Sequence, residues 1–202
     1  MSTPPSPNAF RTAALCGTLS GLLLALPALT EAFTGETTAT SVLLALSPAF
    51  ALPLLTALHR RQSPATGRFG DLALTVNLIG LGLFGGAAFA ANLVLFHFDD
   101  AAVKEALAGS PTVPVLIASA TVLAVGCALF GTTLIRARVF PRIPSWGYAT
   151  VVPLFAFLTS LPDSPLTIAL HILVGGILLW LGVALWHAQA PTSSPSRLPV
   201  AS

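Results

Sequence analysis

The chain has 202 residues, of which 54% are hydrophobic and only 8% are charged, and its formal net charge is +2. Soluble domains carry about 25% charged residues, so most of this apolar surface must face something other than water. The composition therefore excludes an ordinary soluble domain, and so small a net charge gives no reason to expect a nucleic-acid partner. We predict an all-α integral membrane protein whose main partner is the lipid bilayer.

Six apolar runs follow one another along the chain. A helix needs about 17–25 residues to cross the hydrocarbon of a bilayer, which is the approximate length of these runs. The runs are Thr12–Phe33, Ser41–His59, Asp71–Phe98, Thr112–Ile135, Ser145–Leu161 and Pro165–His187. They are continuous rather than alternating, which excludes a membrane β-barrel. We predict a single six-helix transmembrane bundle over residues 12–187, with disordered Pro/Ser-rich ends at residues 1–11 and 188–202.

Two of the runs leave alternatives open. The fifth is short and contains Pro153, so a bundle of five helices is the nearest alternative. The first follows Arg11 and loosely fits a cleaved signal peptide, but it is long for one and we expect it to stay as the first helix. Pro27, Pro48 and Pro53 lie inside other runs and are expected to bend those helices.

The charged residues predict an orientation, because lysines and arginines in short loops are retained on the cytoplasmic side of a membrane. Six crossings place eight of the nine basic residues on one face: Arg11, Arg60, Arg61, Arg68, Arg136, Arg138, Arg142 and Arg197. Lys104 alone lies on the other face. The acidic residues show the reverse pattern, with Asp71 as the exception. We therefore predict that both termini are cytoplasmic.

The stretch from Leu134 to Tyr148 joins the fourth and fifth runs and holds Arg136, Arg138 and Arg142. Pro141 breaks the helix between these runs. Two interpretations of the arginines remain open. They set the topology only, or they also hold anionic lipid headgroups, for which each cation near the surface contributes about 1 kcal/mol.

This stretch is similar to an elbow between helices in uncharacterised bacterial multi-pass membrane proteins. The residues that carry the likeness are Arg136, Val139, Phe140, Pro141, Arg142 and Trp146. The resemblance implies a multi-pass membrane protein and no particular activity. Together with the charge pattern, it leads us to expect a location in the cytoplasmic membrane of a bacterium.

The third run is the richest in small and amide side chains. Gly82 and Gly86 form a G-x-x-x-G motif, which favours close helix packing, either inside the bundle or between two copies. The alternative is that these glycines line a narrow path. Asn77 and Asn92 lie about 60° apart around the same helix, and they predict either hydrogen bonds between helices or a polar lining for a solute.

The remaining polar residues do not form a recognisable site. His171 and His187 lie about 160° apart on one helix, which argues against a two-haem arrangement. His97, Asp99 and other polar residues of the outer rim are of types that can bind a metal ion, but their spacing matches no known metal-binding motif. We expect Cys16 and Cys127 to be buried thiols that pack against apolar neighbours. We expect no catalytic residues, no metal site and no cofactor.

The function favoured by these observations is non-enzymatic: a structural, assembly or accessory role exerted through helix packing, with a second copy or another membrane protein as partner. The alternative is a small-solute transporter or channel with a path along the third run. An intramembrane enzyme or redox protein is the third interpretation.

Overall fold

The computed structural model describes residues 7–108, 110–159 and 164–188. Helix makes up 91% of these residues and no strand occurs among them, so the all-α prediction is confirmed. Four helical segments in the described part are long and apolar enough to cross a membrane: Asn8–Thr34, Thr38–His97, Thr112–Ala137 and Pro165–His187.

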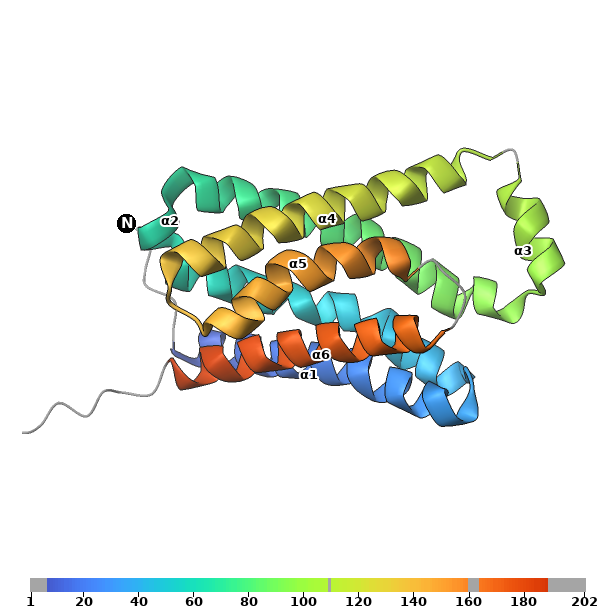
Figure 1. Ribbon diagram of the computed structural model, residues 1–202, viewed down its shortest axis with the longest axis horizontal. Coiled ribbons are helices and arrows are strands. Elements are labelled where there is room, and N and C mark those ends of the chain that lie inside the picture. Colours follow the sequence, from blue (N-terminus) through green and yellow to red (C-terminus); the bar gives the residue numbers. More distant parts are fainter. Residues whose placement is uncertain (1–6, 109, 160–163, 189–202) are drawn as a thin grey trace, which may run out of the picture.

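The helices run roughly side by side in one bundle (Figure 1). Their bounds are Pro7–Thr34 (α1), Thr38–Leu93 (α2), the short 3₁₀ turn Leu95–His97 (η1), Asp100–Leu107 (α3), Thr112–Ala137 (α4), Arg142–Leu158 (α5) and Pro165–His187 (α6). α1 packs along α6 and α2, α4 packs along α2, and α5 lies between α4 and α6. Leu54, Phe130 and Leu181 are fully buried in the shared core.

The longest helix, α2, doubles back on itself at Gly67 (Figure 1). Gly67 has φ 53° and ψ −146°, a conformation that side-chain-bearing residues rarely adopt. The second and third predicted runs therefore correspond to two antiparallel limbs of α2, residues 38–66 and 68–93. The turn places the start of α2 and its end at the same end of the bundle.

The first helix begins at Pro7, five residues before the start predicted at Thr12. Residues 7–11 had been assigned to a disordered lead, and that part of the assignment differs from the structure. Proline is well tolerated in the first turn, where its missing N–H has no helical partner, and Phe10 packs against the core. Residues 1–6 and 189–202, and with them Arg197, lie outside the described residues.

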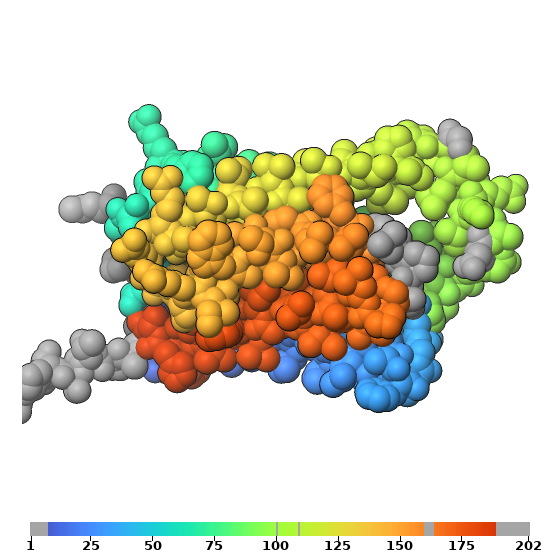
Figure 2. All heavy atoms as spheres, viewed as in Figure 1, coloured from blue at the N-terminus to red at the C-terminus, as the bar shows by residue number. Residues whose placement is uncertain are grey.

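A short helix that the apolar pattern did not predict lies beyond the end of α2. α3 starts after Asp99, whose carboxylate accepts a hydrogen bond from the Ala102 amide at 2.8 Å. Its polar composition is the reason that a search for apolar runs passed over it. α3 and the first turns of α4 stand out from the rest of the bundle in the space-filling view (Figure 2).

The fifth run forms a helix, α5, with Pro153 inside it. Its 17 residues are at the lower limit of about 17–25 for a membrane span. Phe155 and Ala156 are buried near the end of the helix. The segment is therefore an integral part of the bundle, although it is shorter than the four membrane-length segments.

Glycines allow the helix backbones to approach closely at several crossings. A methyl group on Gly175 of α6 would lie 2.6 Å from the carbonyl oxygen of Gly21 in α1. One on Gly126 of α4 would lie 2.5 Å from the Cα of Asn77 in α2. In lipid, helix association depends on such close contacts, because burial of apolar surface adds little there.

The arginines of the described residues gather at one end of the bundle, together with Asp71. At one end α1 begins, α2 turns back, α4 meets α5 and α6 finishes (Figure 1). We call it the basic end because these segments hold Arg11, Arg60, Arg61, Arg68, Arg136, Arg138 and Arg142. Lys104, Glu31, Glu36 and Glu105 lie in or beside the segments of the opposite end. Asp163 lies outside the described residues.

Candidate functional site

The junction between α4 and α5 positions the three arginines predicted as a lipid-binding or topogenic cluster. α4 ends with Arg138 in a left-handed conformation (φ 54°, ψ 25°), and the Arg138 amide donates to the Leu134 carbonyl. Phe140 is 5% exposed and anchors the connection in the core. α5 then starts at Arg142, directly after Pro141. The end of α4 at Arg138, the buried Phe140 and the helix start after Pro141 together hold the three arginines at the surface.

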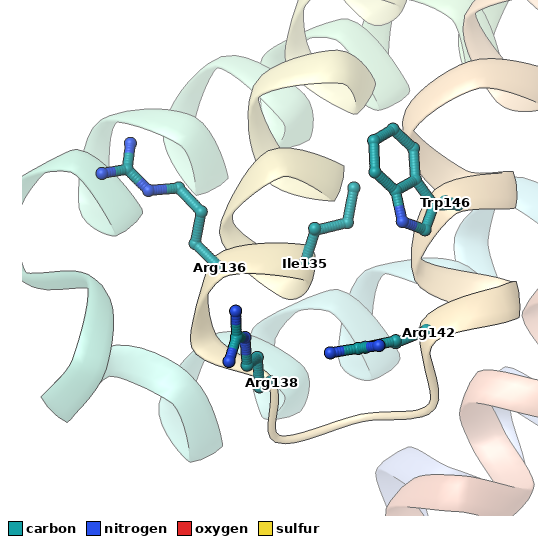
Figure 3. A pocket seen from close by; sticks show the side chains of 5 residues that line it. All are labelled: Ile135, Arg136, Arg138, Arg142 and Trp146. Carbon is teal, nitrogen blue, oxygen red and sulfur yellow. The ribbon is translucent and has the colours of Figure 1, made fainter.

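Ile135, Arg136, Arg138, Arg142 and Trp146 line an open hollow of about 590 Å³ at this junction, which we call the arginine hollow (Figure 3). Arg142 extends across the gap between the two helices toward the side where Arg138 lies, and the Arg138 guanidinium lies beside the end of α4, whereas Arg136 extends away from both. All three arginines are exposed. Among the described residues, no carboxylate lies within ion-pair distance of their guanidiniums.

Two other arginines of the basic end are engaged within the protein. The Arg11 guanidinium lies 5.7 Å from the centre of the Trp186 ring, a cation–π contact between α1 and α6. Arg61 donates to the carbonyl oxygen of Ala188, just after the last turn of α6. These two cations secure the end of α6, which sets them apart from the three in the arginine hollow.

A polar cluster is buried between α2, α4 and α5. The Asn77 amide donates to the Tyr148 hydroxyl at 2.8 Å, and the Cys127 thiol donates to the Asn77 carbonyl oxygen at 3.2 Å. The Tyr148 ring packs edge-on against Phe130. All polar atoms of the Asn77 side chain are therefore used between helices. Sequence analysis identified Asn77 but not its two partners.

A second polar group lies near the turn of α2. The Gln62 amide donates to the Thr133 hydroxyl of α4 at 2.8 Å, and Thr133 donates to the Phe130 carbonyl at 2.6 Å. The His59 ring lies 3.1 Å from the Asp71 carboxylate and so joins the two limbs across Gly67. These contacts hold the turn to α4. Sequence analysis had assigned no role to Gln62 or Thr133.

The two glycines of the G-x-x-x-G motif do not take part in the close helix contacts within the chain. Gly82 and Gly86 are exposed, and a methyl group on either would have no neighbour within 4 Å. The close approach of α2 to α4 occurs instead at Gly80, which lies two residues before Gly82 and about 200° away around the helix. Asn92 donates to the Ala88 carbonyl of its own helix at 2.8 Å. The structure thus does not bring Asn92 together with Asn77.

The two outer-rim histidines considered for metal binding each pack against a phenylalanine. His171 packs edge-on against Phe155, with ring centres 4.8 Å apart, and its Nδ1 lies 2.8 Å from the Thr167 carbonyl oxygen. His97 packs against Phe96. Over the described residues, no group of three His, Cys, Asp or Glu side chains is close enough to hold a metal ion. Both cysteines there are unpaired thiols.

Comparisons of the chain with models of known protein families, with curated proteins and with solved structures found no match.

Proposed function

We propose that the chain is a six-span protein of the cytoplasmic membrane of a bacterium, with both termini and the basic end on the cytoplasmic side. Each limb of α2 exceeds the length of about 20 residues that a span requires, and α5 reaches the lower limit. Seven arginines at one end of the bundle support this orientation, because basic residues are retained in the cytoplasm.

We further propose that the protein has a non-enzymatic accessory or assembly role in which it holds anionic lipid headgroups at the arginine hollow. One observation carries this proposal: three arginines line a single hollow, and no carboxylate among the described residues is near enough to neutralise their guanidiniums. Arginine forms paired hydrogen bonds with phosphate oxygens, and cations at this depth attract anionic headgroups.

The buried polar residues support a structural role for the interior of the bundle. Asn77 bonds with Tyr148 and Cys127, so its polar atoms join three helices. An interhelical hydrogen bond in a membrane contributes about 0.6 kcal/mol on average. A path for a small solute would need such groups to face an open space, so these contacts favour packing over transport.

The orientation is tested by a matched pair of exposed alanines, Ala65 in the turn of α2 and Ala106 in α3. Each is replaced by cysteine in a Cys16→Ala background and exposed to a membrane-impermeant maleimide in intact cells. We expect Ala106→Cys to be labelled from outside and Ala65→Cys to be labelled only after the cells are permeabilised. The opposite labelling pattern would contradict the proposed orientation.

Lipid binding is tested by quantifying the anionic lipid that remains with the purified protein. Arg136→Gln combined with Arg138→Gln removes two guanidiniums from the hollow, whereas Arg68→Gln removes one exposed cation from the turn of α2. At about 1 kcal/mol for each arginine, the double variant should retain at least about tenfold less anionic lipid than the wild type. Equal retention by the double variant and the wild type would refute the binding role.

A further inference from the structure

We propose that the arginine hollow selects a lipid whose headgroup carries two phosphate groups. One phosphate is held between Arg138 and Arg142, and the other is held by Arg136. This inference rests on the proposed function, because it names the class of lipid that the same site takes. Three features support it: the directions of the three side chains, their charge and the apolar surface beside them.

The three guanidiniums do not converge on one point. Arg142 reaches from the start of α5 toward Arg138 at the end of α4, while Arg136 extends away from both (Figure 3). A single phosphate between Arg138 and Arg142 would therefore leave Arg136 without an anion. A headgroup with two phosphates joined by a short polyol would supply a second anion for Arg136.

The charge of the site leads to the same class of ligand. Three guanidiniums carry three positive charges, and no carboxylate of the described residues is paired with them. A phosphodiester has one negative charge and two terminal oxygens, which match the fork of one guanidinium. The first turn of α5 adds to the positive field, because Pro141 provides no side-chain cap for its free N–H groups. One diester is too little to neutralise this arrangement.

The size and surroundings of the hollow indicate a lipid rather than a soluble diphosphate. Its volume of about 590 Å³ is far larger than a single ion requires, and lies in the usual range of about 300–1,000 Å³ for ligand sites. Apolar side chains are exposed beside the cations: Val139 is 41%, Ile143 is 70% and Trp146 is 56% exposed. Exposed aliphatic and indole groups at a membrane surface contact the glycerol and upper acyl region of a lipid.

The test compares two lipids with the same acyl chains in nanodiscs with a zwitterionic background: phosphatidylglycerol, with one phosphodiester, and diphosphatidylglycerol, with two. Binding of each lipid to the full chain is measured by native mass spectrometry at equal phosphate content. We expect the two-phosphate lipid to bind the wild type about fivefold or more tightly per phosphate, since one more arginine is engaged.

The arginine variants assign each phosphate to its position. Arg136→Gln should abolish the preference between the two lipids and leave binding of phosphatidylglycerol unchanged. Arg138→Gln combined with Arg142→Gln should weaken both lipids, and Arg68→Gln should change neither. If Arg136→Gln leaves the preference intact, the second phosphate is not at Arg136 and the inference is wrong.

The outcomes separate this inference from the proposed function. If both anionic lipids bind equally per phosphate and better than the zwitterionic lipid, the two-phosphate inference fails and the lipid-binding role stands. If neither anionic lipid exceeds the zwitterionic lipid, the proposed function itself fails. Inorganic diphosphate is added as a soluble competitor. Displacement of lipid at comparable concentration would overturn the lipid as ligand, and continued lipid binding would support it.

Discussion

Gly80 and Gly82 of α2 are only two residues apart, but replacement by alanine should change the free energy of unfolding in opposite directions at the two positions. A methyl group on Gly80 would lie 2.5 Å from the backbone nitrogen of Leu123 in α4. The same methyl group on Gly82 would meet nothing within 4 Å. Gly80→Ala and Gly82→Ala therefore add the same atoms to one helix, and only the first adds them to a helix contact.

The expected magnitudes follow from these surroundings. In a helix interior, alanine is about 0.8–1 kcal/mol more favourable than glycine, and Gly82→Ala should gain up to that amount. At Gly80 the obstructing atoms belong to the backbone and cannot rotate aside, so α2 and α4 must separate. Overpacking of this kind costs about 1–3 kcal/mol, which exceeds the gain in propensity. Gly80→Ala should lower the free energy of unfolding by roughly 1–2 kcal/mol.

The assay is reversible unfolding of the purified protein in mixed detergent micelles with increasing dodecyl sulfate, followed by circular dichroism. Oligomeric state is measured in parallel. Wild-type stability in Gly80→Ala would refute the packing of α2 on α4 described above. A marked loss of stability in Gly82→Ala, with a change of oligomeric state, would show that this exposed glycine packs against another chain.

Three further substitutions, one of them with a matched control, test separate parts of the structure. Asn77→Leu should lower the free energy of unfolding by about 1–2 kcal/mol in the same assay, since its partners on α4 and α5 lose their hydrogen bonds. Asn92→Leu is the matched control and should be nearly neutral, and an equal loss in both would contradict this. Arg138→Gly should raise stability by about 1 kcal/mol, because it relieves a left-handed backbone, yet reduce the anionic lipid retained. A fall in stability would argue that Arg138 is structural. Gly67→Ala should cost about 1–3 kcal/mol through its backbone alone, and unchanged unfolding would mean that α2 turns back differently.

Much of the fold follows from the apolar runs. Runs of membrane-spanning length require helices, because a backbone in lipid must satisfy its own hydrogen bonds. The end of α4 was predicted within two residues, since cations mark the end of a helix, whereas α5 begins at Arg142, three residues before the predicted Ser145. The turn of α2 was placed in a loop, but the conformation of Gly67 was not foreseeable from composition.

The contacts of the buried polar residues could not be predicted from the sequence. Asn77 meets Cys127 and Tyr148 across separations of 50 and 71 residues, which depend on how α2, α4 and α5 are rotated about their axes. Rotation also explains why Gly80, rather than Gly82, meets α4. The G-x-x-x-G pattern identifies a surface that permits close approach, but it does not say which face of the helix meets a neighbour.

The arginine hollow was predicted in part. Sequence analysis identified its three cations and left open whether they only set the topology. Their arrangement around one hollow, with no carboxylate of the described part paired with them, supports the binding interpretation. The left-handed conformation of Arg138 had no signal in the sequence, because arginine has no preference for it.

The central claim is that guanidiniums of the arginine hollow contact lipid phosphate. Solid-state NMR tests it directly, by dephasing of arginine-labelled ¹⁵N guanidinium signals by ³¹P in bilayers that contain anionic lipid. We predict dephasing in the wild type and in Arg68→Gln, and its loss in Arg138→Gln combined with Arg142→Gln and Arg136→Gln. Equal dephasing in this triple variant and the wild type, or none in the wild type, would contradict the claim.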